Sequence, residues 1–435
     1  MNPISSLRHE GSPPEVLIPS DEEVDAVPEP ENSGEKAPRR TPQPRLVRLR
    51  YEHTSLHPGC TPWANGRRAL CANIIGYIWT TNQDDEHNTI TLSFFDHSVH
   101  KDIYIADEVK YDLACLSEEA ALFARKRTGK VWLRFHDSER DSWHFSCDGG
   151  VLAIALTKQH VFVYAKTGVI YSFDAHGTPT SITRESRDPV VACATHEDIL
   201  MVVRTTAGGL YYTLEDVSTQ SYLQNKLCVD VSPEAGLKGV FFTQNGDPCI
   251  YDTNEVLSTL VNWRSPMQAR WIPVFDGVEH AKQVGRTETY WPLAVTADQF
   301  LCIALRGDLK YPQLPLPVIS HLKLKMPLLS GGEASYLLYA NTFRQLQATA
   351  AELGEADQEL RTELDRQIND AVLEMDRALL IQLQAALSEK RLAKGLAIAQ
   401  SINLGEAMEI AAKIATHCDL PDVAKQIEQL AEHKK

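Results

Sequence analysis

The segment Val151-Leu-Ala-Ile-Ala-Leu156 is followed, after four residues, by Val161-Phe-Val-Tyr164 and, after four more, by Val169-Ile-Tyr-Ser-Phe173. Segments of this length that are rich in β-branched and aromatic residues favour β-strands. The links between them are too short for a parallel crossover, which needs a dozen or more residues, so neighbouring strands must be antiparallel. This stretch therefore predicts a three-stranded meander.

Similar apolar clusters recur along residues 46–332. They begin near Cys71, Tyr111, Trp143, Val190, Gly239 and Tyr290. Six such units give a period of about 48 residues with several strands in each, which is typical of a β-propeller. We therefore predict a six-bladed propeller over residues 46–332. A pair of β-sandwiches remains the alternative, because the Trp-Asp and Gly-His marks of ordinary WD repeats are missing.

The two flanking regions differ from this β region in composition. Residues 1–45 contain nine prolines, nine acidic residues and no aromatic residue, so they cannot bury enough apolar surface to fold, and we predict a disordered leader. Residues 333–435 contain one proline and no tryptophan and are rich in Ala, Leu, Glu and Gln, which predicts helices. The expected protein is mainly β with a C-terminal α domain.

Apolar residues in the last region recur three or four positions apart, which predicts five helices packed as a bundle. The stripes run over Tyr339–Ala350, Leu360–Leu387, Leu392–Ala399, Ile410–Ile414 and Val423–Leu430. Asn403 and Glu406 are predicted to form a capping box at the fourth helix. Asp419 is predicted to cap the last helix, with Pro421 in its first turn.

Charge and cysteine usage restrict the class of protein. The net charge of −15 opposes non-specific nucleic-acid binding, although Arg125-Lys126-Arg127 or Arg45–Arg50 could contribute to a local basic patch. The nine cysteines form no C-x-x-C pair, which indicates a reducing compartment without disulfides. The longest apolar run is Val151–Leu156, and the first residues do not resemble a secretory signal, so we expect an intracellular protein without a membrane span.

Local patterns that deliver catalysis or bind metals are weak. Phosphate-binding glycine loops are absent. Lys166-Thr167-Gly168 matches a motif of β-lactamases, but the serine motif at Ser320, which should come before it in the chain, comes after it. His53, His57 and Cys60 have spacings suited to zinc but no second ligand pair, and loop positions are the more common role for such residues. We interpret His97 and His100 as packing or turn residues and Asp84-Asp85 as loop charges. The sequence predicts no catalytic residue, no metal and no cofactor.

Several short motifs occur in a characteristic order. Five motifs follow one another late in the β region: Trp271-Ile-Pro-Val-Phe-Asp276, Tyr290-Trp291-Pro292, Tyr311-Pro312, Pro317-Val318 and Pro327-Leu328. Further motifs come before and after them in the chain: Phe94-Phe95-Asp96, Tyr111–Ser117 with Ala121–Ala124, and Leu420-Pro421 with Ala424–Leu430. This set resembles the C-terminal, SepB-type domain of a replisome adaptor family. Its members are called chromosome transmission fidelity protein in yeasts and WD-repeat and HMG-box DNA-binding protein in animals. The resemblance spans roughly residues 51–431.

The resemblance implies a non-catalytic, nuclear homotrimer that assembles through its propellers. Such a hub links the GINS component of the replicative helicase to the catalytic subunit of DNA polymerase alpha and supports sister-chromatid cohesion. Family members carry an N-terminal WD-repeat domain and, in animals, an HMG box. Neither is found in this sequence, so we expect a fragment of a longer protein and do not expect direct DNA binding.

The resemblance also implies where partners bind, because clients offer a short helix with apolar and acidic residues to the helical domain. Such recognition needs an uncovered apolar stripe and complementary charge at its edge. The predicted apolar groove is Val372, Met375, Leu379, Leu396, Ala399, Met408 and Ala412, and the predicted basic rim is Lys390, Arg391, Lys394 and Lys413. The alternative is that these apolar residues are core and the cations a solvated face.

Two other classes of protein are alternatives to an adaptor, namely a propeller hydrolase and a coat or scaffold subunit. A propeller hydrolase would place His, Asp or Glu on the inner strands, whereas the candidates for these strands are mostly Ala, Val and Leu. A coat or scaffold subunit would usually continue into a long helical solenoid, whereas only about 100 helical residues follow the predicted propeller.

Overall fold

The computed structural model describes residues 53–434, except 84–86, 185–187, 230, 233, 317, 328, 330 and 354–357. The described residues belong to one compact unit, Leu49–Lys435. The predicted leader, the basic run Arg45–Arg50 and the pair Asp84-Asp85 lie outside the described residues.

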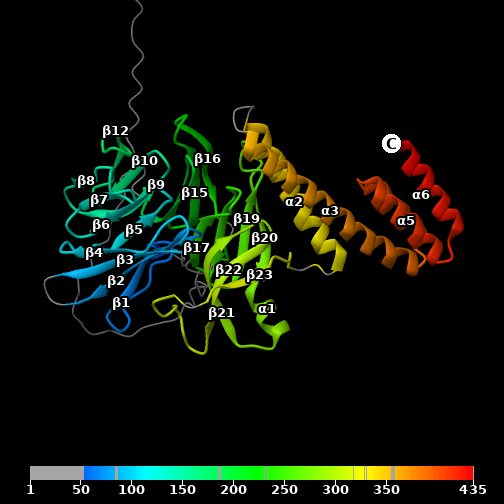
Figure 1. Ribbon diagram of the computed structural model, residues 1–435, viewed down its shortest axis with the longest axis horizontal. Coiled ribbons are helices and arrows are strands. Elements are labelled where there is room, and N and C mark those ends of the chain that lie inside the picture. Colours follow the sequence, from blue (N-terminus) through cyan, green and yellow to red (C-terminus); the bar gives the residue numbers. More distant parts are fainter. Residues whose placement is uncertain are drawn as a thin grey trace, which may run out of the picture. The chain divides into compact units, whose positions relative to one another are not determined.

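Within this part of the chain, 23 strands form six sheets of consecutive antiparallel strands, the blades of a six-bladed propeller (Figure 1). Blade A contains β1 (Arg67–Ala72), β2 (Gly76–Asn82), β3 (Asn88–Phe94) and β4 (Ile103–Asp107), and blade B contains β5 (Leu113–Leu116), β6 (Ala120–Ala124), β7 (Lys130–Phe135) and β8 (Trp143–Ser146). Blade C contains β9 (Val151–Leu156), β10 (His160–Ala165), β11 (Val169–Asp174) and β12 (Pro179–Arg184), and blade D contains β13 (Val190–His196), β14 (Ile199–Thr206), β15 (Gly209–Asp216) and β16 (Ser221–Cys228). Blade E contains β17 (Leu237–Phe242), β18 (Pro248–Asp252), β19 (Val256–Val261) and β20 (Arg270–Asp276), and blade F contains β21 (Glu288–Val295), β22 (Gln299–Arg306) and β23 (Ser320–Lys323).

The predicted meander is confirmed as β9, β10 and β11, with Val163 paired to Ile154 on one side and to Tyr171 on the other. One predicted unit boundary is wrong. Trp143 does not begin a blade but lies on β8, the last strand of blade B, and the third blade begins at Val151. The Trp143 ring packs 5.3 Å from that of Phe173 in blade C, so its apolar cluster marks a contact between blades.

The core lies between the blades. The first strand of each sheet neighbours the first strand of the next, and each adjacent pair of sheets shares one cluster of buried apolar side chains. Blade F packs against blade A in the same way, through Trp291 and Leu293 on β21 and Ala72 and Tyr77 on blade A. The ring is therefore closed by side-chain packing between the last sheet and the first.

A segment before the first blade joins four blades at one face of the ring. We call the face on which the first strand of each sheet begins the N-face, the opposite one the C-face, and residues 53–61 the strap. Its hydrogen bonds are Leu56 N to Val191 O (2.7 Å), His57 Nε2 to Ala114 O (2.8 Å), Leu237 N to His53 Nε2 (2.8 Å) and Ala69 N to Thr61 Oγ1 (2.8 Å). These partners lie on the inner strands β13, β5, β17 and β1, so the strap ties blades A, B, D and E together.

Six helices lie in the described part of the chain, one more than predicted. The additional helix, α1 (Gly277–Val284), connects blade E to blade F, and the Asp276 side chain accepts a hydrogen bond from Glu279 N at its N-terminus. Its eight residues lack the large apolar stripe from which the other five helices were predicted. The remaining helices are α2 (Gly331–Glu352), α3 (Gln358–Ser388), α4 (Leu392–Ser401), α5 (Gly405–His417) and α6 (Pro421–Lys434). Among the described helices, none is both long and apolar enough to span a membrane.

The five C-terminal helices pack in two groups. α2 and α3 form an antiparallel pair, and α4, α5 and α6 share a core with the C-terminal half of α3. The domain limits 46–332 and 333–435 remain predictions, with β23 ending at Lys323 and α2 beginning at Gly331.

The N-termini of α5 and α6 differ from the predictions. The N-cap residue of α5 is Leu404, and no side chain of the expected capping box bonds there. Instead, the buried Asp376 carboxylate of α3 accepts hydrogen bonds from Leu404 N (2.7 Å), Asn403 N (2.9 Å) and Asn403 Nδ2 (2.9 Å). Asp419 has a φ of 58° and does not cap α6, although α6 begins at Pro421 as predicted. A residue distant in sequence thus provides the cap that was expected locally.

Candidate functional site

The strongest candidate region is the core shared by α3, α4, α5 and α6, because all of the predicted groove residues except Val372 and Met375 belong to it. The Asp376 contacts described above fix the start of α5 against α3. Small side chains allow α5 to pack closely, since its buried face consists of Ala407, Met408, Ala411, Ala412 and Ala415. The region is therefore a compact helical cluster at the end of the chain.

Most of the predicted groove residues are buried within the chain itself. Met375, Leu379, Ala399, Met408 and Ala412 are all less than 9% exposed. Val372 and Leu396 are half-buried, and Leu396 packs at the edge of the shared core. The five buried residues serve as core, as the alternative interpretation proposed, and only Val372 and Leu396 offer surface. That these residues form a docking groove remains a prediction.

The four predicted rim cations are exposed but lie in two places. Lys390, Arg391 and Lys394 lie together at the turn between α3 and α4 and the start of α4. Arg391 pairs with Glu389 at 3.0 Å and Lys394 pairs with Glu333 at 3.1 Å, and both are exposed ion pairs of the kind that water screens strongly. Lys413 lies on α5, where it lines a cleft. Their role as a rim remains a prediction.

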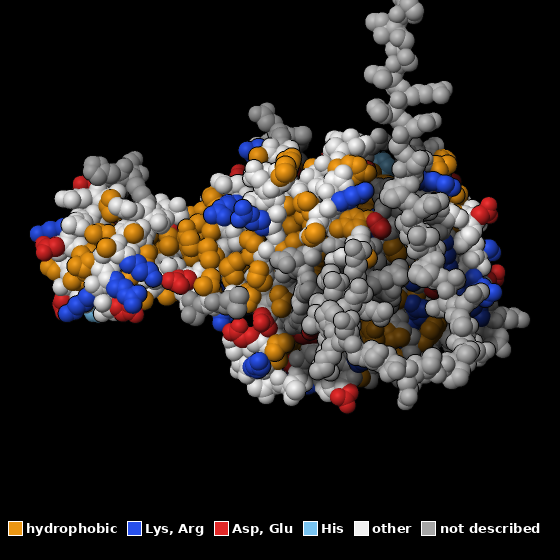
Figure 2. Space-filling view, turned by 180° about the vertical axis from the view of Figure 1, so that it is seen from behind, with side chains coloured by type: hydrophobic (Ala, Val, Ile, Leu, Met, Phe, Trp, Pro, Cys, Tyr) orange, Lys and Arg blue, Asp and Glu red, His pale blue; other side chains and the backbone are white. Residues whose placement is uncertain are grey.

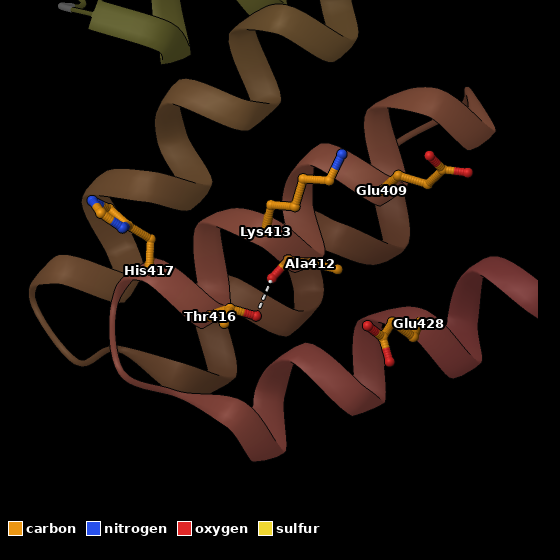
Figure 3. Close-up of a pocket in the computed structure, with 6 residues that line it drawn as sticks. All are labelled: Glu409, Ala412, Lys413, Thr416, His417 and Glu428. Carbon is orange, nitrogen blue, oxygen red and sulfur yellow. Dashed lines mark hydrogen bonds between the residues drawn. The ribbon is translucent and has the colours of Figure 1, made fainter.

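The cleft between α5 and α6 has a volume of about 480 Å³ (Figure 3). Glu409, Ala412, Lys413, Thr416 and His417 of α5 and Glu428 of α6 line it. The Thr416 hydroxyl donates a hydrogen bond to the Ala412 carbonyl oxygen at 3.0 Å, which keeps this side chain on its own helix. In Figure 3, Glu428 points from α6 toward α5 while Lys413 and Glu409 extend from α5. The lining carries both signs of charge and suits a polar edge of a partner better than an apolar anchor.

Apolar side chains that sequence reasoning assigned to the core of α5 are instead accessible. Ile410 is 46% exposed and Ile414 is half-buried, because the alanine face of α5 points inward. With Lys413 and His417 they form what we call the α5 outer face. Exposed apolar residues also occur on α3 at Leu373 and Ile381, and Figure 2 shows such side chains gathered on the helices. The alanine-rich composition of residues 407–415 could have indicated this exposure, because a helix that packs through alanine turns its larger residues outward.

The residues considered for zinc are occupied by structural contacts. His57 is half-buried and its ring bonds to Ala114 O, and desolvation lowers its pKa to about 4, so it is neutral at physiological pH. His53 accepts from Leu237 N, and the Cys60 sulfur accepts from Arg68 at 3.0 Å. Within the described residues, no group of three or more His, Cys, Asp or Glu side chains could hold a metal ion.

The remaining candidates also have structural positions. His97 lies 3.8 Å from Asp102, and His100 packs against Phe94, as the interpretation of these residues as packing or turn groups suggested. Lys166-Thr167-Gly168 forms the turn between β10 and β11. All nine cysteines lie in the described part and are free thiols.

A buried charge network lies where α2 meets blade E. Asp247 accepts a hydrogen bond from Trp263 Nε1 at 2.9 Å and lies 3.6 Å from Arg264, whose guanidinium also donates to Glu352 of α2 at 2.7 Å. Burial raises the pKa of Asp247 to about 6, opposed by its contacts with Trp263 and Arg264. Beside this network, the Gln345 side chain of α2 bonds to Asn262 N and Leu260 O. These contacts attach α2 to the propeller.

Comparison with known proteins gives matches over both parts of the chain. Residues 54–328 match the family described as the middle region of minichromosome loss protein, Mcl1, and residues 340–435 match the C-terminal domain of DNA polymerase alpha-binding protein Ctf4. The first range contains every strand of the propeller and the second contains most of α2 and all of α3 to α6.

Individual relatives agree with these matches. The chain is 34% identical over 400 residues to minichromosome loss protein 1 of Schizosaccharomyces pombe, covering 87% of this chain and 49% of the relative. It is 28% identical to the DNA polymerase alpha-binding protein of Saccharomyces cerevisiae, covering 88% and 48%, and 24% identical to human WD repeat and HMG-box DNA-binding protein 1, covering 62% and 25%. The chain thus spans about half the length of the two yeast relatives.

Proposed function

Because this chain belongs to the family of minichromosome loss protein Mcl1 and DNA polymerase alpha-binding protein Ctf4, we propose that it acts as a replisome adaptor that binds DNA polymerase alpha. One observation carries the proposal. The helices α2 to α6 coincide with the range that matches the C-terminal domain of a protein named for binding this polymerase. Relatives named as binding proteins also support a non-catalytic role, in the nucleus.

In the proposed assembly, three copies form a hub through their propellers. The hub links the GINS component of the replicative helicase to the catalytic subunit of DNA polymerase alpha. Closed rings of identical subunits present identical docking sites, and two partners bound to one hub gain effective concentration for each other. The trimer and both partners are proposals that rest on the family resemblance.

Docking on the helical cluster needs accessible apolar surface next to positive charge, because the clients' helices combine apolar and acidic residues. The α5 outer face has both. Ile410 and Ile414 lie one turn apart on the helix, with the cation Lys413 and the imidazole of His417 beside them. Leu396 and Val372 are further accessible members of the predicted groove. We therefore place the docking surface on the outer side of the cluster rather than among its buried residues.

Binding of a fluorescein-labelled acidic amphipathic helical peptide, followed by anisotropy, tests this placement. We expect Ile410→Glu to weaken binding by about tenfold or more, because truncation or reversal of a central contact typically costs over 1 kcal/mol. Its melting temperature should stay near that of the parent protein, because Ile410 is 46% exposed. Met408→Glu should instead lower the melting temperature by several degrees, because it buries an unpaired charge.

A matched control is Met267→Glu, which adds the same charge at a residue 95% exposed on a propeller loop and should change neither quantity. If Ile410→Glu, Lys413→Glu and Leu396→Glu all bind the peptide normally, the docking surface is elsewhere. If Met267→Glu weakens binding as much as Ile410→Glu does, the effect is one of net charge only.

A further inference from the structure

The two faces of the propeller differ in the charge of their turns around blades B and C. On the N-face, the turn between β6 and β7 carries Lys126, Arg127 and Lys130, and the turn between β10 and β11 carries Lys166. On the C-face, the turn between β5 and β6 carries Glu118 and Glu119, and the turn between β13 and β14 carries Glu197 and Asp198. A chain with a net charge of −15 thus concentrates cations at one place on the N-face.

The backbone brings the two basic turns together. Both bond to the link between blades B and C, since Val151 N donates to Lys126 O at 3.1 Å and Lys166 N donates to Gly150 O at 3.0 Å. Gly150 has a φ of 88°, and a Cβ there would lie 2.4 Å from the Lys126 carbonyl oxygen. Only glycine permits this approach, so the position of the cations is built into the fold.

Two arginines of blade A, each over a tryptophan ring, extend this surface. Arg67 lies 5.4 Å from the centre of the Trp79 ring, and Arg68 lies 5.8 Å from that of Trp63, which is 47% exposed. Arg68 donates a hydrogen bond to Cys60 Sγ of the strap at 3.0 Å, and His57 of the same strap bonds to Ala114 O of blade B, so the strap connects Arg68 with blade B. We call Trp63, Arg67, Arg68, Lys126, Arg127, Lys130 and Lys166 the N-face cation patch.

Exposed carboxylates lie on the links beside the patch, Glu108 between blades A and B and Asp148 between blades B and C. Asp112 pairs with Arg125 at 3.7 Å, so neither belongs to the patch. Asp84, Asp85 and Glu86 near blade A lie outside the described residues. Among the residues that the structure describes, none forms an ion pair with Lys126, Arg127, Lys130 or Lys166.

We propose that the N-face cation patch binds single-stranded nucleic acid, with phosphates on the cations of blades A to C and a base stacked on Trp63. Proteins that bind single strands combine a cationic track for the backbone with aromatic rings for the bases. An exposed indole beside the cations favours this ligand over an acidic peptide, which needs the charge alone. Duplex DNA is not favoured, because its bases are stacked inside and unavailable to Trp63.

The test uses the whole chain and a fluorescein-labelled 20-nucleotide oligothymidylate, with anisotropy measured at 50 and 200 mM salt. We expect the double variant Arg127→Glu/Lys166→Glu to weaken binding at least tenfold and to reduce the salt dependence. Trp63→Ala should weaken it by about fivefold or more at either salt, because stacking on one base is worth that much. The control Lys158→Glu makes the same charge change as each single substitution, on the opposite face of blade C, and should bind like the parent.

Other outcomes would overturn the proposal. Absence of binding up to 100 µM protein at 50 mM salt would do so, as would equal losses for Lys158→Glu and the double variant. If a 20-residue polyglutamate displaces the oligonucleotide at equal concentration and Trp63→Ala has no effect, the patch is a surface for acidic peptides. Melting temperatures of all variants exclude unfolding as the cause. Binding of the helical peptide to α5 should not change, which keeps this inference separate from the proposed function.

Discussion

At the residue scale, two buried aspartates connect segments that are distant in sequence. Asp376 holds the start of α5 from 27 and 28 residues away, and Asp247 lies in the network that attaches α2 to blade E. Asp376 takes the place of the capping box that was predicted within the local sequence. Each aspartate gives a prediction about stability.

Asp376→Ala removes the acceptor for Asn403 N and Leu404 N, so α5 loses its only described cap. We expect a loss of about 1–3 kcal/mol, as for a cap that also leaves buried donors unsatisfied. Urea unfolding followed by circular dichroism at 222 nm measures it. Asp422→Ala, in the exposed first turn of α6, should change stability by less than about 0.5 kcal/mol. Equal effects of the two substitutions would contradict the capping role.

Asp247→Asn should change how stability depends on pH. The pKa of Asp247 is raised from 3.8 to about 6 by burial, so the folded protein holds this proton more tightly than the unfolded chain does. The contribution of protonated Asp247 to the free energy of unfolding is therefore fully present below about pH 4. It is lost as the pH rises through 6, which lowers the free energy of unfolding by about 3 kcal/mol in total. Asparagine has no such titration. The difference in unfolding free energy between the two proteins should shift in favour of the variant from pH 4 to pH 7, and a constant difference would argue against a raised pKa.

At the element scale, the composition of α5 decides which of its faces is buried. A face of alanines and one methionine packs against α3 and α6, Ile414 lies half-buried at the edge of this core, and Ile410 is turned toward solvent. The strap has a comparable role for the propeller, since a short irregular segment bonds to the inner strands of four blades. Small alanines set the packing of α5, whereas the strap is held by hydrogen bonds, three of them made by its side chains.

Ala411→Leu should destabilise the helical region, because Ala411 is fully buried between helices and a leucine would force them apart. Overpacking of this kind costs about 1–3 kcal/mol. The matched control is Ala393→Leu on α4, an exposed position where leucine should be neutral. Thermal melts at 222 nm compare the two variants. A wild-type melt for Ala411→Leu would mean that α5 packs loosely.

At the scale of the whole molecule, the propeller closes on itself through the cluster between blades F and A, and the C-terminal half of α3 forms a second core with α4, α5 and α6. The fourth strand of blades A to E and the third of blade F pair with one strand of their own sheet.

We expect residues 46–435 to form a homotrimer in solution, a prediction that rests on the family resemblance. Light scattering after gel filtration should give three times the chain mass across micromolar concentrations. A mass of one chain over that range would contradict the hub. The N-face substitutions Arg127→Glu and Lys166→Glu provide a useful comparison, because they should leave the mass unchanged unless the patch is part of the interface.

Much of the fold could be predicted from sequence, because its signals are local. Short apolar runs with links of about four residues required antiparallel meanders, and the spacing of these units gave six blades. Apolar residues three or four positions apart gave the five helices after the propeller. The errors fall where a local signal had a distant cause, as for Trp143, which packs against the next blade, and for Asn403, whose acceptor lies on α3.

The sequence by itself determined the order of a β-propeller and a helical region, because apolar runs, short links and helical period are signals that act over a few positions. Only the tertiary structure decided which apolar residues stay accessible and which cations meet. Ile410 and Met408 look alike in sequence, yet one is 46% exposed and the other 1%. His53 bonds to Leu237 across 184 positions. Such contacts exist only once the ring has closed, since closure and packing bring together residues that no local pattern relates.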